Sequence, residues 1–391
     1  MKARINTFIN NIVFTPKPLP AGNYQAILKL DTGPSYRLHL RIDEKGTGIL
    51  ILNASTILHL NPTAVEFAYH LIKQTPLEMV IGEVMKRYQV TTEVAQQDFE
   101  DFKERLETLV KTPDLDPETF LDMERVAIND ENVTAPMRLD CALTYAVTDE
   151  SAAVYAPVER VKQVLGTEEW KQILKNSWDA GIPHVVFTGG EPTLRPDVAE
   201  LIKFTEELGQ VCGLITDGHK LSSAEYLKEI LQAGLDHLMI VLNPDNEESW
   251  KSIQSVIRED IFLTVHLTVT SANKNQFNSI LQRLSGLEVK SLSISAHSEE
   301  IWKILPQFTQ KAVENGFSLV WDLPVPYSSL NPIALELEQG EIRSEGAGSA
   351  WLYVEPDGDV LSGQGKEAVL GNFLNDPWQR IWAQAKIARH G

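Results

Sequence analysis

From residue 138 onward the sequence repeats one unit, in which a short apolar run is followed by a segment with helical periodicity. The apolar runs are RLDCALTY, HVVFT, VCGLIT, LDHLMIVLN, FLTVHLTVT, KSLSIS and FSLVWD. The helical segments between them cover residues 167–180, 197–208, 222–233, 247–257, 275–286 and 299–314. Strands that are apolar throughout and alternate with helices are typical of a parallel sheet covered on both faces. The pattern predicts an α/β fold with a partial (β/α)6 TIM-like barrel, whose working site lies at the carboxyl ends of the strands.

The segments on either side of this repeat have different patterns. Before it, the strand-like runs YQAILKL, YRLHLRI and GILILN precede three helical segments. The third helix is expected to bury one side made of Val94, Phe99, Phe102, Leu106 and Leu109. After the repeat, WLYVEPDGDVLSG predicts a hairpin and DPWQRIWAQAKIAR predicts a terminal helix. The expected parts are a small α+β domain at 1–111, an acidic linker at 112–136, the barrel at 137–335 and an extension at 336–391.

The charge balance restricts the partners that this chain can have. Its 54 acidic and 35 basic residues give a net charge of −19, which argues against nucleic acid or an anionic membrane surface. No run of about 18 uncharged apolar residues exists, and the N-terminus lacks the features of a signal peptide. Cys141 and Cys212 are expected to be free thiols on neighbouring buried strands, so we expect a cytoplasmic protein.

One short motif follows the HVVFT strand directly. In TGGEP, Gly189 and Gly190 would allow the backbone to approach a ligand closely, because neither carries a Cβ. Glu191 could accept hydrogen bonds from an amine, and Pro192 fixes the turn. The alternative is a strand-to-helix turn that binds nothing.

Landmarks in fixed order surround this motif. LTY at 143–145 is followed by TGGEPTLRPD at 188–197, LITDG at 214–218 and VLN at 241–243. This order resembles the radical S-adenosylmethionine superfamily, in particular its peptide-modifying branch, over nearly the whole chain. The resemblance implies a winged-helix-like peptide-recognition domain at 1–111 and a small SPASM or twitch extension at 336–391.

The resemblance also implies where cofactors would bind. The positions that correspond to cofactor contacts are Gly189, Gly190, Glu191, Pro192, Thr216, Asp217 and Asn243. The three cysteines that hold the family's 4Fe–4S cluster correspond to Val147, Ser151 and Val154. Such a cluster needs thiolate ligands, and no histidine spacing suggests another metal site. We therefore expect no cluster, no other metal, no catalytic residue and no required cofactor, and leave S-adenosylmethionine binding open.

Two functions of different classes follow from these residues. The first is a non-catalytic relative that binds a peptide substrate, a leader peptide or a partner enzyme in a peptide-modification pathway. Its peptide would add as a strand to an exposed sheet edge at YRLHLRI or GILILN, unless both are interior strands. The second is an S-adenosylmethionine-binding, peptide-modifying enzyme that works without the usual cluster, or a cysteine-substituted form of an active enzyme.

Overall fold

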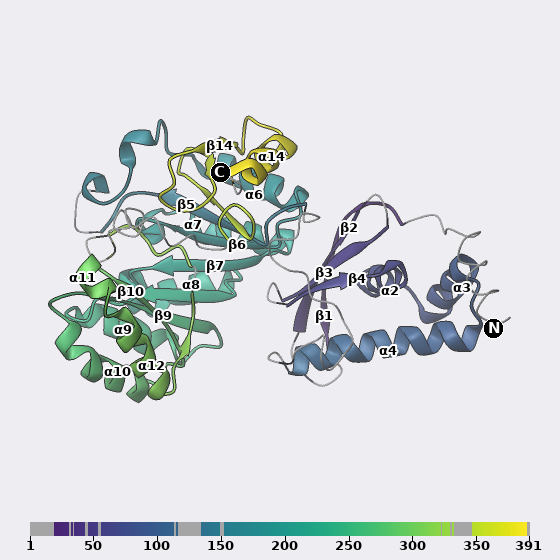
Figure 1. Cartoon of the computed structure of the whole chain (residues 1–391), viewed down its shortest axis with the longest axis horizontal. Helices are drawn as coiled ribbons and strands as arrows, with labels where there is room; N and C mark the ends of the chain where they lie inside the picture. The colour runs from purple at the N-terminus through teal and green to yellow at the C-terminus, as the bar shows by residue number, and fades with distance from the viewer. Residues whose placement is uncertain are drawn as a thin grey trace. The chain divides into compact units, whose positions relative to one another are not determined.

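The computed structural model forms two compact units, Met1–Asp130 and Glu131–Gly391, which are described separately (Figure 1). The structure describes every residue except 1–18, 31–32, 34, 44–45, 54–55, 113–114, 116–133, 149–151, 322, 329–330, 332–345 and 389–391. Most of the predicted linker at 112–136 therefore lies outside the described residues, and the finer domain boundaries stay predictions.

In its described residues, the first unit forms a four-stranded antiparallel sheet with three helices. Its strands, in spatial order, are β1 (Gly22–Lys29), β2 (Ser35–Ile42), β3 (Gly48–Leu52) and β4 (Thr56–Leu60). Its helices are α2 (Pro62–Ile72), α3 (Leu77–Tyr88) and α4 (Thr92–Lys111). The predicted order of strands and then three helices is confirmed. The sequence analysis missed β4, because its run TILHL is short and leads directly into the cap of α2.

Alternating residues of this sheet and one side of each helix form the core of the first unit. Leu38, Leu40 and Leu50 project from the sheet and are fully buried. On α4, Phe99, Phe102, Leu106 and Leu109 are buried as predicted. Val94 is 45% exposed, so its predicted place on the buried side is wrong. It lies in the first turn of α4, where the buried side begins only with Ala95.

Among the residues that the structure describes, the second unit has one ten-stranded sheet with helices on its outside (Figure 1). The strands, in spatial order, are β11 (Ser318–Leu319), β10 (Ser291–Ala296), β9 (Phe262–Val269), β8 (His237–Val241), β7 (Val211–Thr216), β6 (His184–Gly189), β5 (Arg138–Thr144), β12 (Trp351–Val354), β13 (Asp359–Leu361) and β14 (Val369–Asn372). The helices are α6 (Thr167–Asp179), α7 (Val198–Leu208), α8 (Ala224–Gln232), α9 (Glu247–Val256), α10 (Phe277–Gly286), α11 (Glu299–Trp302), α12 (Leu305–Glu314) and α14 (Trp378–Ala388). Strands β5 to β11 are parallel, so the α/β fold and the partial barrel are confirmed.

Two features of this sheet differ from the sequence prediction. The predicted hairpin is present as β12 and β13, but β12 also pairs in parallel with β5, so the C-terminal part extends the barrel sheet. Cys141 lies on β5 and Cys212 on β7, with β6 between them. The two thiols are free and buried as expected, but the prediction of neighbouring strands is wrong.

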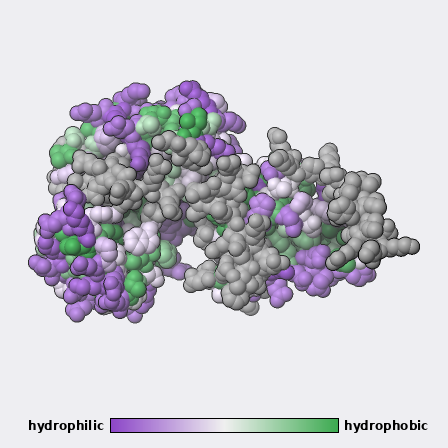
Figure 2. All heavy atoms as spheres, viewed as in Figure 1, coloured by the Kyte–Doolittle hydropathy of each residue, from purple (hydrophilic) through white to green (hydrophobic). Residues whose placement is uncertain are grey.

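The surface of the molecule is mainly hydrophilic. On the face shown in Figure 2, hydrophilic side chains cover most of the coloured surface, and hydrophobic ones form small separate patches. In the described part of the chain, no helix combines the length and apolar character needed to cross a membrane.

The core of the first unit provides a test of this packing. Leu106→Ala removes a side chain with no exposed surface, and we expect it to lower the free energy of unfolding by about 2–5 kcal/mol. Val94→Ala on the same helix removes a half-exposed side chain and should cost less than about 1 kcal/mol. Urea unfolding followed by circular dichroism measures both. Equal losses for the two variants would contradict the assigned face of α4.

Candidate functional site

The end of β6 lies unusually close to the backbone that follows β5. Gly190 N donates to Thr144 O at 2.8 Å, and Glu191 N donates to Ala146 O at 2.7 Å. A Cβ on Gly189 would lie 2.2 Å from Thr144 O, and one on Gly190 would lie 2.1 Å from Ala146 O. Gly189 also has φ +121°, which favours glycine. The chain's own backbone therefore requires both glycines, whether or not a ligand is present.

Glu191 joins the ends of β6 and β7. Its side chain is 4% exposed, and both carboxylate oxygens accept hydrogen bonds from the chain itself. Oε1 accepts from Thr216 Oγ1 at 2.8 Å and from Thr193 N at 2.9 Å, and the hydroxyl of Thr193 donates to the same oxygen. Oε2 accepts from Asp217 N at 2.7 Å. Three predicted site residues, Glu191, Thr216 and Asp217, are thus brought together.

The environment of Glu191 changes its acidity. Burial and the nearby Asp217 carboxylate raise the pKa of Glu191 to about 8, although the hydrogen bonds from Thr193 and Asp217 act in the opposite direction. Glu191, which was expected to accept hydrogen bonds from an amine, therefore already accepts them from groups of the chain itself. In this structure Glu191 serves as a link between two strand ends.

A second layer of contacts surrounds Asp217. Its Oδ2 accepts from Thr148 Oγ1 at 2.5 Å, and its Oδ1 accepts from His219 N at 2.9 Å. His219 Nε2 lies 2.9 Å from Asn246 Nδ2, and Lys220 Nζ donates to Thr193 O at 2.6 Å. The loop after β5 is in this way tied to the loops after β6, β7 and β8. The sequence analysis missed these partners. Thr193 was the easiest of them to predict, because it lies only two residues after Glu191.

The remaining predicted positions lie apart from this network. Pro192 begins the short helix η3 (Pro192–Leu194), immediately after Glu191. Asn243 follows β8, where its N donates to Ser249 Oγ and its Oδ1 accepts from Asp245 N, both at 3.2 Å. Neither contact involves Glu191, so the structure does not bring Asn243 into the same cluster.

The positions that correspond to the cluster ligands are only partly described. Val147 is half-buried, and Val154 is 68% exposed at the end of the short helix η1 (Ala152–Val154). Ser151 lies outside the described residues. The two side chains that are described at these positions end in hydrocarbon and offer iron no donor atom.

One buried polar group on the sheet was not predicted. His266 on β9 is 1% exposed, with Nδ1 3.0 Å from Ser293 Oγ and Nε2 3.0 Å from Ser295 Oγ on β10. Burial lowers the pKa of His266 to about 3, so the imidazole is neutral at physiological pH. The same side of β6, β7 and β8 carries Val186, Ile215, Met239 and Val241, which pack together. The alternation of polar and apolar residues in HLT and SLSIS was the sequence pattern that could have predicted this buried polar group.

Known proteins were compared with this chain by sequence and by structure. Residues 141–278 match the model of the radical SAM superfamily. PqqA peptide cyclase from Bradyrhizobium diazoefficiens is 27% identical over 243 residues, which cover 55% of this chain and 63% of that protein. The chain thus matches less than two thirds of the length of this curated relative.

Solved structures share the fold. SuiB from Streptococcus suis bound to S-adenosylmethionine has a TM-score of 0.56 and 14% identity, covering 94% of this chain and 90% of that chain. SuiB bound to the precursor peptide SuiA has a TM-score of 0.54 and 14% identity, covering 88% and 87%. At this identity the likeness shows the fold alone.

The family match corrects the cofactor prediction. Radical SAM proteins bind S-adenosylmethionine and a 4Fe–4S cluster, so the expectation of no required cofactor and no cluster is wrong. That expectation rested on the residues at the thiolate positions, whereas the family match extends over residues 141–278. The side chains of Val147 and Val154 do not fit as thiolate ligands, and both cysteines are buried within strands. No reaction step can therefore be assigned to a cluster from the residues described.

The raised pKa of Glu191 gives a prediction about stability. Because the folded protein keeps a proton that the unfolded chain loses, the stabilisation is complete below about pH 4.5 and is lost as the pH rises to about 8. The free energy of unfolding of the wild type should thus fall relative to that of Glu191→Gln over this range. Urea unfolding at a series of pH values measures the difference. The exposed control Glu207→Gln should run parallel to the wild type, and a parallel curve for Glu191→Gln would contradict the raised pKa.

Three kinds of observation agree on the second unit. Its strands form a partial barrel, its GGEP turn joins the ends of β5, β6 and β7 through internal contacts, and residues 141–278 match one family model. Structures that share the fold over most of this chain contain S-adenosylmethionine or a precursor peptide. By these findings, residues 141–278 of this chain are similar to the radical SAM superfamily.

Proposed function

We propose that this protein binds a peptide in a peptide-modification pathway and captures it along the edge strand β1. Two similar proteins support a peptide as the partner. One is called a peptide cyclase for PqqA, and the other, SuiB, was solved in complex with its precursor peptide SuiA. The net charge of −19 favours a basic or weakly charged peptide.

The observation that carries this proposal is the edge of the first sheet. Strand β1 pairs with β2 along all eight of its residues and with no other strand in the described part of the chain. Of the two alternatives for YRLHLRI and GILILN, the interior one is confirmed, because these runs lie in β2 and β3 and each of these strands pairs on both sides. An extended peptide can add to such an edge through main-chain hydrogen bonds.

The register shows which amides of β1 face outward. Arg37 on β2 uses its backbone oxygen to accept from Asn53 N at 3.0 Å and its backbone N to donate to Asn53 Oδ1 at 2.9 Å. Both groups of Arg37 therefore point away from β1. Ile27 lies directly opposite Arg37, so its own N–H and C=O point away from β2. The side chain of Ile27 is 48% exposed and adds an apolar contact beside this open amide.

We further propose that binding, rather than catalysis by its own residues, is the contribution of this chain. Glu191 is occupied by internal donors, and the described ligand positions carry valine. A peptide or partner enzyme held by the first unit needs neither group.

A proline substitution tests the edge. Ile27→Pro removes an N–H that faces away from β2, so the fold should persist and peptide binding should fall at least about tenfold. Selection of a displayed library of random peptides on the wild type provides the probe, and fluorescence polarisation measures its affinity for each variant.

Ile57→Pro is the matched control on the opposite edge. Ile57 on β4 lies opposite Ile51 on β3, and its N–H and C=O face away from β3 as those of Ile27 face away from β2. This variant should therefore keep wild-type affinity. Equal loss in both variants, or full binding by folded Ile27→Pro, would show that β1 is not the docking edge.

The second candidate is an S-adenosylmethionine-dependent peptide-modifying enzyme. The retained strand-end cluster of Glu191, Thr216 and Asp217 favours it, because these positions correspond to cofactor contacts in the family. Calorimetry against S-adenosylmethionine, followed by an assay for 5′-deoxyadenosine after anaerobic reconstitution and reduction, separates the two candidates. Under the proposed function the chain releases no 5′-deoxyadenosine, and sustained release would replace a binding role with catalysis.

A further inference from the structure

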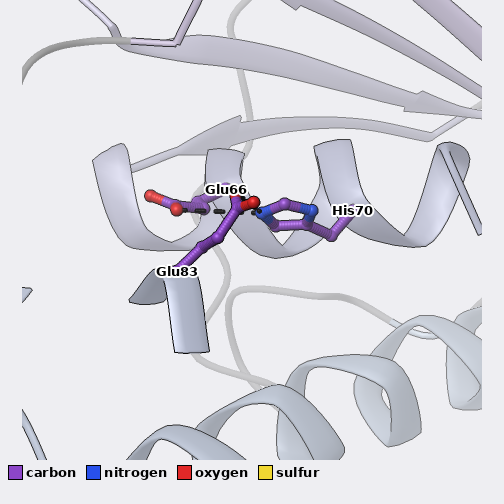
Figure 3. Close-up of side chains that lie close together, drawn as sticks. All are labelled: Glu66, His70 and Glu83. Atoms are coloured by element: carbon purple, nitrogen blue, oxygen red, sulfur yellow. Dashed lines mark ion pairs between the residues drawn. The ribbon is translucent and has the colours of Figure 1, made fainter. Parts of the chain in front are cut away.

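Three ligand-type side chains meet in the first unit, far in sequence from the GGEP turn (Figure 3). Glu66 and His70 lie one turn apart on α2, and Glu83 reaches them from α3. One donor atom from each lies within 4.8 Å of the others. Figure 3 shows the His70 ring pointing toward both carboxylates. The E-x-x-x-H spacing on α2 was visible in the sequence, but Glu83 was not, since it comes from a different helix.

His70 is held in an orientation that suits a metal ligand. Its Nδ1 lies 3.2 Å from Thr75 Oγ1, which leaves Nε2 directed at the two carboxylates. The side chain is 4% exposed, and Nε2 has no hydrogen-bond partner among the described residues. Metal-binding histidines commonly use the second ring nitrogen in this way to fix the ring.

The spacing is that of ligands around an ion rather than that of direct hydrogen bonds. His70 Nε2 lies 3.8 Å from Glu66 Oε1 and 3.5 Å from Glu83 Oε2. A direct hydrogen bond would be about 2.7–3.2 Å. Ligand atoms about 2.1 Å from a tetrahedral zinc ion are separated by about 3.4 Å, which is close to the observed values.

The charges around the cluster also leave room for a cation. Glu66 has no exposed surface, and Arg87 at the end of α3 donates from Nε to its Oε1 at 2.9 Å. The two carboxylates and Arg87 together carry a net charge of −1. Glu83 is 47% exposed, so one of the three side chains borders solvent while the other two are buried.

We propose that Glu66, His70 and Glu83 bind one divalent transition-metal ion of the zinc type. One imidazole and two carboxylates suit zinc, and water would complete the coordination. The ion links α2, which packs on β1, β2 and β3, to α3. It therefore stabilises the unit that carries the proposed peptide edge, although the site does not depend on that function.

Zinc binding by the full chain tests this site. After dialysis against a chelator, calorimetry with zinc chloride should give one site per chain that is lost in Glu83→Gln, and the melting temperature of the first unit should rise with zinc concentration. Thr75→Val should weaken zinc binding by about 10–100-fold, because it removes the partner that orients His70. Cobalt(II) should give a visible absorption spectrum that depends on Glu83.

Two substitutions in the same unit are matched controls. Glu78→Gln replaces an exposed glutamate of α3, and His59→Asn replaces an exposed histidine of β4; both should keep the site. Glu83→Gln changes an exposed side chain, so loss of zinc binding there does not reflect unfolding. If the wild type binds no zinc, or binds it as tightly in Glu83→Gln as in the controls, the cluster is an ion pair of protonated His70 and the proposal is wrong.

Discussion

The close approach of the β5 and β6 ends is the constraint on which the barrel's site depends. Two backbone hydrogen bonds to Thr144 and Ala146 pull the GGEP turn against the preceding loop and leave no space for a Cβ at Gly189 or Gly190. This contact points Glu191 inward, where it joins the ends of β6 and β7. A motif that looks like a ligand cradle therefore also has a structural role, which explains how it can persist when the residues around it change.

The two units divide the functional evidence between them. The second unit carries the family match and the strand-end cluster, and Val147 and Val154 occupy two of the positions predicted from the sequence for cluster ligands. The first unit carries the sheet edge β1, which pairs only with β2 among the described strands, and a cluster of one histidine and two glutamates. Peptide capture and metal binding in the first unit can be studied without assuming any chemistry in the second.

The sequence was sufficient for features that repeat along the chain. Continuous apolar runs predicted the parallel strands, and helical periodicity predicted the helices between them, because burial on both faces leaves little room for polar residues. Pairings between distant segments could not be read in this way. The parallel contact of β12 with β5, the cover that β4 gives to β3, and the meeting of His70 with Glu83 depend on tertiary packing. The sequence analysis put Thr216 and Asp217 in the same predicted cofactor site as Glu191, but only the structure showed that both donate hydrogen bonds to Glu191.

The most direct measurement is the stability of Gly190→Ala in the absence of any ligand. If the glycine is required by the chain itself, the new Cβ against Ala146 O should lower the free energy of unfolding of the second unit by about 1–3 kcal/mol or more. Gly286→Ala, where a Cβ meets nothing within 4 Å, is the control and should be neutral or stabilising. Wild-type stability in Gly190→Ala would contradict the account and would leave a bound ligand as the reason for the glycine.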